Sequence, residues 1–330
     1  MRAVICESWR DFDALELKDI PPPPLRPRCV RIRVAAAGVS FATQLVVAGK
    51  YQRRPPLPFA PGTEVVGTII EAAPDAEAPP IGTRVFAVLD WGGYAEEAVV
   101  DDIHVFPIPD GLPMEPAVAL PTSYSTAGAA LLWRARPAPG DWVLVHGAAG
   151  GVGLAGVEIA KVMGLRVVAR AGAAKHGMLR ARGADVVLDS AEPFREAVRA
   201  ATGGQGVGCV LDTIGGDAFD DSLRCLADGG TLVVIGFAGG GIPTVAANLL
   251  LLKNIAVAGV NWGTYVGWSP GDNRRVHAQR VQQMWSQLVG WWRDGALKPE
   301  VHAAFPLALF REAMAEVRER RSAGRVILTP

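Results

Sequence analysis

Residues 146–153, with the sequence H-G-A-A-G-G-V-G, combine residue types and a spacing that suit the binding of a nucleotide phosphate. The GxxGxxG pattern consists of Gly147, Gly150 and Gly153. Small residues let a pyrophosphate approach peptide N–H groups, and a helix start adds the positive end of its dipole. A buried strand pattern at 142–146 precedes the turn, and a helical pattern at 152–164 follows it. A glycine triplet alone is often only a turn, but this strand–turn–helix context predicts dinucleotide binding.

The residues at the end of the next strand indicate which dinucleotide would bind. A site for NAD carries an acidic residue there, about 20 residues after the glycine turn, for the ribose hydroxyls. This chain has Arg170 at that place and Lys175 at the start of the next helix. Two cations suit the 2′-phosphate of NADPH, because charge-assisted hydrogen bonds hold a phosphate best. The two residues can also be ordinary solvated surface residues, but the pattern favours NADPH.

A regular alternation of strands and helices surrounds these residues. Strand patterns lie at 166–169, 185–188, 207–212 and 231–235, with helical patterns between them. Such alternation is typical of a parallel sheet with crossover helices, so we expect a doubly wound α/β domain of the Rossmann type over residues 119–259. The cofactor contacts expected in this domain are Gly147, Ala149, Gly150, Gly151, Val152, Arg170, Lys175, Gly236 and Phe237.

The N-terminal part of the chain has a different pattern, up to about residue 115. Short strand patterns, typical of an irregular β-barrel, are separated there by Pro/Gly turns, and they lie at 29–35, 65–70, 84–88 and 97–100. Near the C-terminus, Asp272 or Asn273 can begin a helix that Gly295 ends, and a last strand spans 325–329. We expect these segments to complete the barrel, so that residues 1–118 and 260–330 form one domain.

The composition argues against several classes of protein. The 330 residues include 33 Lys+Arg and 33 Asp+Glu, and this neutral balance argues against a nucleic-acid partner. Residues 229–252 carry no charge, but six glycines and a proline divide them into two short elements rather than a membrane span. The four cysteines are scattered, so neither a disulfide framework nor a four-thiolate zinc site is expected. The charged opening MRAVICESWRDFD lacks the apolar run of a signal peptide, so we expect a cytoplasmic protein.

Several segments, distributed along the whole chain, resemble one family. They are residues 36–51, 55–64, 145–153, 252–263 and 324–330. These segments are similar to the zinc-independent quinone oxidoreductase (zeta-crystallin-like) branch of the medium-chain dehydrogenase/reductase superfamily. The resemblance implies a GroES-like β-barrel catalytic domain, a Rossmann domain and NADPH in the cleft between them. It also implies a homodimer formed by edge-strand pairing through residues 255–260, although this strand can equally be an interior one.

The same resemblance implies a reaction without a metal. Zinc-dependent members of the superfamily carry a cysteine near the position of Ser40, and Gly-His-Glu where this chain has Gly62-Thr63-Glu64. Both ligands are missing here, as is the four-cysteine lobe that holds structural zinc, so we expect no metal. Without a Lewis acid, hydride delivery to a conjugated acceptor is favoured over alcohol oxidation. Glu64 is then expected to be buried in a hydrogen-bond network.

Family positions also indicate which residues contact the reactants. Many members have Asn and Asp where this chain has Ser40 and Thr43, which leaves the expected wall of the substrate cleft uncharged. Tyr51 matches a tyrosine at the mouth of that cleft, and Thr126 matches a helix start beneath the nicotinamide. The expected catalytic residues are Ser40, Tyr51, Thr126 and Asn261, with Thr126 also a cofactor contact, and the expected substrate pocket consists of Thr43, Tyr51, Trp262 and Tyr265. Each polar group could instead make a structural hydrogen bond, and each ring could pack at the domain seam.

The function expected from these features is NADPH-dependent, zinc-free transfer of hydride to a quinone or an α,β-unsaturated carbonyl. Two alternatives stay open. The replacements at Ser40 and Thr43 slightly favour an enoyl-thioester or alkenal double-bond reductase. A catalytically silent protein that binds NADPH as a sensor would carry the same cofactor motif.

Overall fold

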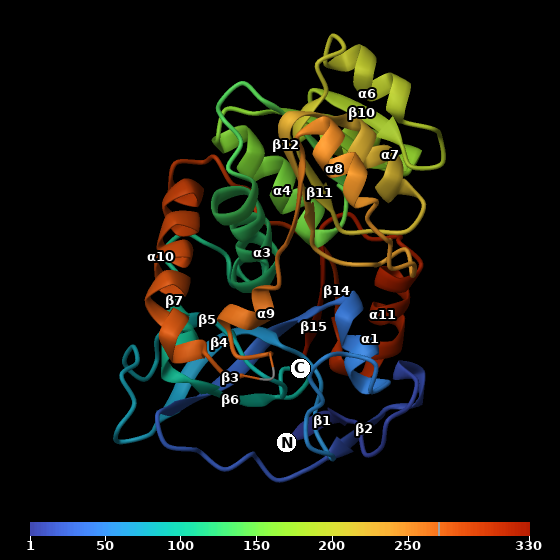
Figure 1. Ribbon diagram of the computed structural model, residues 1–330. Coiled ribbons are helices and arrows are strands. Elements are labelled where there is room, and N and C mark those ends of the chain that lie inside the picture. The colour runs from blue at the N-terminus through green and yellow to red at the C-terminus, as the bar shows by residue number, and fades with distance from the viewer. Residues whose placement is uncertain (270) are drawn as a thin grey trace. The chain divides into compact units, whose positions relative to one another are not determined.

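The computed structural model describes residues 1–269 and 271–330, and its chain divides into two units (Figure 1). The first unit consists of Met1–Thr122, Trp262–Val289 and Pro299–Pro330, and the second of Ser123–Asn261 and Gly290–Lys298. Most of the C-terminal part of the chain thus belongs to the first unit, and one short segment belongs to the second. The domain limits expected at 118/119 and 259/260 stay a prediction, close to the boundaries of these units.

A seven-stranded sheet forms the centre of the first unit. Its strands run in the order β14-β15-β3-β4-β5-β7, and β6 also pairs with β3. Their bounds are β3 (Cys29–Val39), β4 (Glu64–Ala72), β5 (Arg84–Val88), β6 (Glu97–Asp101), β7 (Val105–Pro107), β14 (Val301–Pro306) and β15 (Arg325–Thr329). Only β14 and β15 pair in parallel. A separate two-stranded ribbon joins β1 (Arg2–Ile5) to β2 (Glu16–Asp19).

The central strand β3 shows why this sheet has one buried face. Val30, Ile32 and Val34 are buried, whereas Arg31 and Arg33 alternate with them and lie nearer the solvent. The alternation predicted at 29–35 is therefore confirmed, since successive side chains of a strand point to opposite faces. The buried side chains join a core that also includes residues of β4, β5 and the C-terminal helix α11 (Phe310–Arg318).

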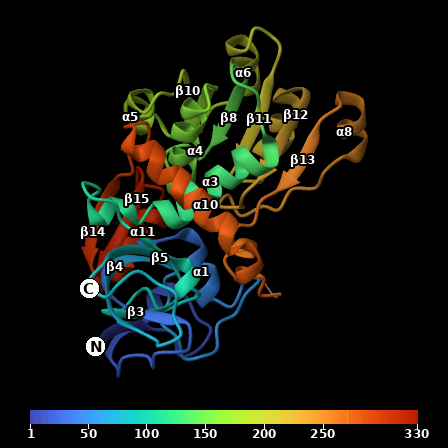
Figure 2. The same ribbon diagram turned by 90° about the vertical axis from the view of Figure 1, so that its left-hand side faces the viewer.

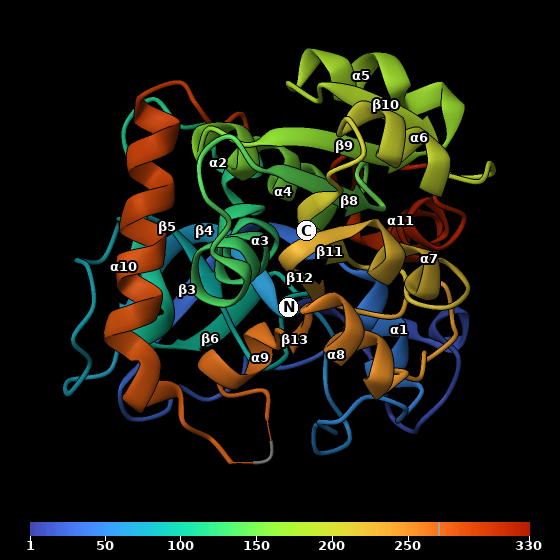
Figure 3. The ribbon, with the colours of Figure 1, turned by 45° about the horizontal axis from the view of Figure 1, so that its top comes forward.

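The long helix α10 (Arg274–Arg293) packs on the same sheet (Figure 3). Asp272 accepts a hydrogen bond from the backbone N–H of Arg274 at 3.2 Å, and the carbonyl of Asn273 accepts the N–H of His277 at 3.2 Å. Both residues expected at the helix start thus bond to its first turn. Trp285 is fully buried, and its ring lies edge-on against Phe86 of β5 at 5.4 Å between centroids. Val281, Met284 and Leu288, which lie at helical spacing from Trp285, are buried with it on one face. Two short helices of this unit are α1 (Phe41–Val47) and α9 (Trp262–Tyr265).

The second unit contains a six-stranded sheet in which every pair of neighbours is parallel. The order is β10-β9-β8-β11-β12-β13, and Figure 2 shows several of these strands side by side. Their bounds are β8 (Trp142–His146), β9 (Arg166–Ala171), β10 (Val186–Asp189), β11 (Val207–Asp212), β12 (Leu226–Val234) and β13 (Ala256–Gly259). The connecting helices are α4 (Gly151–Val162), α5 (His176–Ala181), α6 (Arg195–Ala201) and α7 (Ala218–Cys225). The predicted alternation is confirmed, and the strand order reverses between β8 and β11, where such sheets bind ligands.

Two further segments have local structure that bears on function. The uncharged residues 229–252 extend from β12 to α8 (Ala247–Lys253), so they are two elements joined by a glycine-containing loop. Among the described residues, no helix is both long and apolar enough to cross a membrane. Residues 114–135 form a broken helical region that consists of α2 (Met114–Ala117), η3 (Leu120–Tyr124), α3 (Ser125–Gly128) and η4 (Ala129–Ala135), of which η3 and η4 are π-helical. Such π-helical turns often occur at functional sites.

Candidate active site

The site residues expected from the sequence divide between the two units. The second unit contains the expected cofactor contacts and Asn261, which is exposed just after β13. The first unit contains the other expected catalytic and substrate-pocket residues, which are Ser40, Thr43, Tyr51, Trp262 and Tyr265.

The glycine turn of the second unit reverses the chain between β8 and α4. Gly147 has φ +61°, a left-handed conformation that glycine adopts without strain. Gly150 donates its N–H to the carbonyl of Gly147 at 2.9 Å and caps α4, which begins at Gly151. The first N–H groups of a helix have no partner within the helix, so those of α4 are available to an anion.

The first turn of α4 lies against the backbone of the glycine turn. A Cβ on Gly153 would stand 2.7 Å from the carbonyl carbon of Gly147 and 2.8 Å from the Cα of Ala148. These atoms are backbone and cannot move aside, so only glycine allows this approach. The sequence predicted close packing of Gly153 on the strand, and the contact is with the turn that ends the strand. The turn therefore fits a pyrophosphate, because its backbone is bare and the helix start is held directly beside it.

The expected cofactor contacts gather at the carboxyl ends of neighbouring strands. The glycine turn follows β8, Arg170 lies near the end of β9, and Gly236 and Phe237 follow β12. The loop after β12 is tied to β11, because the N–H of Gly236 donates to the carbonyl of Asp212 at 3.3 Å. Phe237 is 38% exposed. This edge of a parallel sheet is where nucleotides bind in such folds.

The carboxylate of Asp212 organises the turn beside this loop. Its Oδ1 accepts the N–H groups of Ile214 and Gly215, both at 2.9 Å. Burial raises the pKa of Asp212, and these two hydrogen bonds oppose that rise. A buried acid at a strand end has no distinguishing sequence signature, so the sequence analysis missed it.

Arg170 makes contacts within the protein that the sequence did not predict. Its Nη2 donates to the carbonyls of Ser190 and Glu192 at 2.7 and 3.1 Å, and its guanidinium carbon lies 4.5 Å from the ring centroid of Phe194. The guanidinium is therefore anchored to the loop after β10 along one edge. Lys175 ends a short 3-10 turn and is partly buried. The contact of these two residues with a phosphate stays a prediction.

His146, the last residue of β8, makes structural contacts between the sheet and a neighbouring helix. Its buried ring shares a hydrogen bond with the hydroxyl of Ser222 in α7 at 2.8 Å and packs edge-on against Phe194. Burial, helped by the positive charge of Arg170, lowers the pKa of His146 to about 3. The ring is thus neutral at physiological pH and joins the strand to α7.

Thr126 lies on a helix that is anchored by a buried carboxylate. It follows Tyr124, whose hydroxyl donates to Glu158 of α4 at 2.7 Å. Glu158 also accepts from Arg182 at 2.6 Å and from the backbone N–H of Lys298 at 2.9 Å. Burial and the Glu158 charge raise the pKa of Tyr124, so this phenol stays protonated. Glu158 was missed by the sequence analysis, although an acidic residue on an apolar helix face is a usable signal.

In the first unit, Ser40 and Thr43 surround the start of α1. The hydroxyl of Ser40 accepts the N–H of Ala42 at 3.2 Å and so caps this helix. Thr43 is buried and hydrogen-bonds to Tyr94, whose hydroxyl also donates to the carbonyl of Gly38 at 3.3 Å. Burial raises the pKa of Tyr94 well above its ordinary value. The hydroxyls of Ser40 and Thr43 thus both make structural hydrogen bonds. Their contact with a substrate stays a prediction.

The aromatic candidates of this unit are packed to different degrees. Tyr51 is partly buried, and burial raises the pKa of its phenol, although a hydrogen bond with Gln52 opposes the rise. Trp262 and Tyr265 lie in α9 with ring centroids 5.8 Å apart, and Trp262 is only 3% exposed. Tyr265 also packs edge-on against His277 of α10 at 5.0 Å. The structure therefore brings Trp262 and Tyr265 together.

Glu64 is buried, as expected. Instead of the expected hydrogen-bond network, it forms an ion pair with Arg325 at the start of β15. Burial lowers the pKa of Arg325 to about 10. Gly38 of β3 makes room for the pair, because a Cβ there would stand 2.7 Å from the carboxyl carbon of Glu64. Among the described residues, no group of three or more His, Cys, Asp or Glu side chains is placed to hold a metal ion.

Comparisons with known proteins agree with this division of fold and site. Residues 26–110 match the alcohol dehydrogenase GroES-like domain, and residues 151–278 match the zinc-binding dehydrogenase domain. The quinone oxidoreductase-like protein 2 of Rattus norvegicus is 38% identical over 331 residues, which cover 99% of this chain and 92% of that protein.

Two solved structures extend the likeness to three dimensions. A mycobacterial protein complexed with NADPH has a TM-score of 0.91 and 30% identity, with 100% of both chains covered. A quinone oxidoreductase of Pseudomonas syringae has a TM-score of 0.88 and 26% identity, covering 100% of this chain and 99% of its own. Fold and site together define an oxidoreductase with a GroES-like unit and a Rossmann unit. The chain belongs to the quinone oxidoreductase-like family of the medium-chain dehydrogenases/reductases.

The close approach at Gly153 can be tested with a pair of alanine variants. Gly153→Ala should lower the free energy of unfolding by about 1–3 kcal/mol, because its Cβ meets backbone atoms. Gly177→Ala is the matched control in α5, where a Cβ meets no atom within 4 Å. This control should gain up to about 1 kcal/mol from the better helix propensity of alanine. Urea unfolding measures both, and equal stability of the two variants would contradict the packing argument.

Proposed function

We propose that this protein is an NADPH-dependent oxidoreductase that reduces a quinone or an α,β-unsaturated carbonyl without zinc. The observation that carries the proposal is the bare glycine turn beneath the start of α4, in a chain of the quinone oxidoreductase-like family. NADPH, when bound, supplies the hydride. The residues of the chain bind and orient the reactants, exclude water and polarise the acceptor oxygen.

NADPH is favoured over NADH by charge. The expected position of an acid holds Arg170, and Lys175 follows it. The loop carbonyls that bind one edge of Arg170 hold its guanidinium in place, which lowers the entropy lost when a phosphate binds. A solved relative with 30% identity is complexed with NADPH, which supports the same cofactor here.

Hydroxyl groups of the first unit are suited to donate a hydrogen bond to the acceptor oxygen. Burial raises the pKa of Tyr51, so its phenol keeps its proton at neutral pH. Ser40 accepts a bond from Ala42, and a hydroxyl that accepts one bond still has its own proton to donate. Such donors stabilise the negative charge that develops on an enolate or hydroquinone oxygen. Thr126 and Asn261, in the second unit, are the further catalytic candidates of the proposal.

The absence of zinc from the proposed reaction is supported by the chemistry of the first unit. Glu64, which accompanies zinc in other branches, is paired with Arg325. A conjugated acceptor delocalises the incoming charge and needs less Lewis-acid assistance than a simple carbonyl. Ser40 and Thr43 have no charge, and their presence supports a second candidate, reduction of the double bond of an enoyl thioester or alkenal.

The function is tested by following NADPH absorbance with chelator-treated protein against a quinone panel and a panel of enals and enoyl thioesters. We expect oxidation of NADPH with at least one panel. Oxidation by quinones alone would support the first candidate, and oxidation by enals or thioesters alone would support the double-bond reductase. NADPH binding without turnover in either panel would contradict both and support the sensor. Activity that disappears after chelation would contradict the zinc-free reaction.

The cofactor preference is tested by substituting both cations. Arg170→Ala with Lys175→Ala should weaken NADPH binding by about tenfold or more and leave NADH binding unchanged, because only NADPH carries the 2′-phosphate. Arg180→Ala, which removes an exposed cation from α5, is the control and should change neither affinity. Fluorescence titration with both cofactors measures the effect. An unchanged ratio of the two affinities in the double variant would refute the assignment.

The proposal includes a homodimer formed through the edge of the second unit's sheet, in a reducing compartment such as the cytoplasm. Strand β13 pairs with β12 on one side, and its other edge can pair with the same strand of a second copy. Helix α8 lies beside this edge in Figures 2 and 3 and exposes Leu251 and Leu252 by 77% and 76%. Exposed leucines next to a free strand edge are typical of a surface that another protein chain covers in an assembly. All four cysteines are free and buried, which fits a reducing compartment.

The dimer is tested by placing charge on that surface. Leu251→Glu with Leu252→Glu should convert the protein to a monomer, because charged side chains would be buried without partners. Ile81→Glu changes a comparably exposed side chain of the first unit, at 65% exposure, and should leave the dimer intact. Light scattering coupled to size-exclusion chromatography measures the mass. A wild-type monomer, or a double variant that still dimerises, would overturn the proposed interface.

A further inference from the structure

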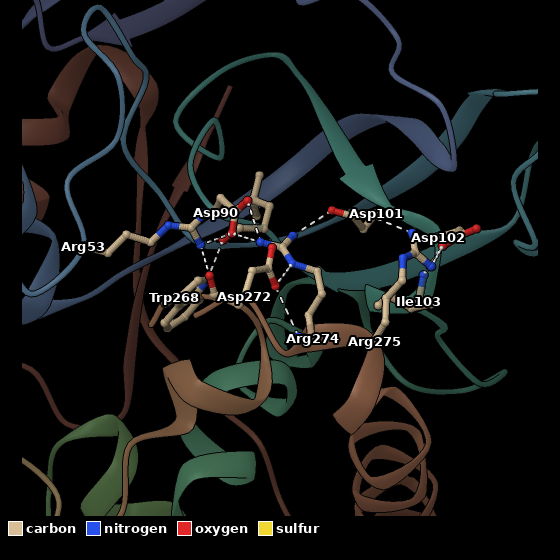
Figure 4. Close-up of polar contacts among 11 residues, drawn as sticks. Arg53, Asp90, Asp101, Asp102, Ile103, Trp268, Asp272, Arg274 and Arg275 are labelled. Atoms are coloured by element: carbon tan, nitrogen blue, oxygen red, sulfur yellow. Dashed lines mark hydrogen bonds and ion pairs between the residues drawn. The ribbon is translucent and has the colours of Figure 1, made fainter. Parts of the chain in front are cut away.

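A network of ion pairs surrounds Arg274, the first residue of α10 (Figure 4). Its side chain is almost completely buried, and Nη2 donates to both carboxylate oxygens of Asp90, at 2.8 and 2.9 Å. Nη1 donates to Asp101 at 2.7 Å, and Nε donates to Asp272 at 2.8 Å. Because all three nitrogens are bonded, the planar guanidinium holds three carboxylates from different parts of the chain in one arrangement.

Arg53 extends the network to a second chain segment. Its Nη1 donates to Asp90 at 2.7 Å and to the carbonyl of Gly267, which is 214 residues away in the sequence. The guanidinium carbon also lies 5.5 Å from the centroid of Trp91. Arg53 follows Tyr51 by two residues, and Gly267 follows Tyr265 by two. The same side chain therefore connects the two segments that carry the aromatic residues expected to contact the acceptor.

The segment after α9 is also fixed at the residues next to this bond. Gly267 has φ +84°, and a Cβ there would stand 2.6 Å from the guanidinium carbon of Arg274. The next residue, Trp268, donates its indole N–H to the carbonyl of Leu89 at 3.2 Å. Residues 267–268 are therefore held by a hydrogen bond from Arg53, by close packing against Arg274 and by the bond of the Trp268 indole to the residue after β5.

A gain in folding stability does not by itself account for such a network of buried ion pairs. Desolvation of buried charges offsets much of their attraction, and apolar side chains of the same size often stabilise a fold as well. A network of paired charges restricts geometry instead, because each charge needs its partner at one place. The geometry that is restricted here is the placement of residues 51–53 relative to residues 262–268.

We propose that Arg53, Asp90 and Arg274 are positioning residues that set the placement of Tyr51 relative to Trp262 and Tyr265, and thereby the affinity for the acceptor. This inference rests on the proposed function, because it concerns how the proposed acceptor is bound. The three residues act through the aromatic side chains rather than by touching the acceptor. Their loss should therefore change acceptor binding and leave the cofactor site of the second unit unaffected.

The test compares Arg53→Gln with Arg54→Gln, which removes the exposed neighbouring charge and is the matched control. Arg53→Gln should raise KM for the acceptor about tenfold, with little change in kcat or in the Kd for NADPH, because misplaced side chains weaken binding. Arg53→Lys should restore part of the affinity, since it keeps the charge beside Asp90. Hydrogen exchange, measured by mass spectrometry on peptides covering residues 51–53 and 262–269, should become faster in Arg53→Gln only.

The two readouts separate failure of this inference from failure of the proposed function. Unchanged exchange in Arg53→Gln, or faster exchange without a change in KM, would overturn the positioning role. Equal effects of Arg53→Gln and Arg54→Gln would overturn it as well. If the wild type reduces no acceptor, the proposed function fails. Hydrogen exchange alone then tests whether the network restricts residues 51–53 and 262–269. Faster exchange in Arg53→Gln but not in Arg54→Gln would support that restriction.

Discussion

The contact between the first turn of α4 and the bare backbone of the glycine turn is the constraint on which the second unit depends. Gly153 allows the helix to start directly beside Gly147, because a Cβ at this position would meet backbone atoms. The helix start then presents its free N–H groups at the edge where β8, β9 and β12 end. The expected cofactor contacts lie at or after the ends of these three strands, and this packing fixes the helix start beside them.

In the first unit, paired buried charges have the corresponding role. Glu64 and Arg325 join the starts of β4 and β15 beside Gly38. The Arg274 network joins loops at the other strand ends to the beginning of α10. Removing one member of such a group leaves an unpaired buried charge, which costs about 3–5 kcal/mol. The requirement for complete pairing explains how irregular loops can have one conformation.

The sequence predicted the elements better than the contacts between them. The alternation at 29–35 and the strand–helix repeat of the second unit were both predicted, because each depends on a local period of burial. Thr43 could not be placed in the same way, because its hydrogen bond is with Tyr94, a residue distant in the sequence. The partners of Glu158 and Arg274 could not be predicted for the same reason, since they lie on other segments.

The sequence by itself determined the α/β class, the glycine turn before α4, the cations at Arg170 and Lys175, and the membership of the oxidoreductase family. The α/β class and the glycine turn are properties of short segments, whose period and spacing follow from backbone geometry. The family follows instead from the resemblance of several segments along the chain. Only the tertiary structure decided that Arg325 faces Glu64, that loop carbonyls hold Arg170, and that Arg53 reaches the carbonyl of Gly267. The reason is physical. A buried charged or polar side chain needs a hydrogen-bond or charge partner, and folding brings that partner from a distant part of the chain.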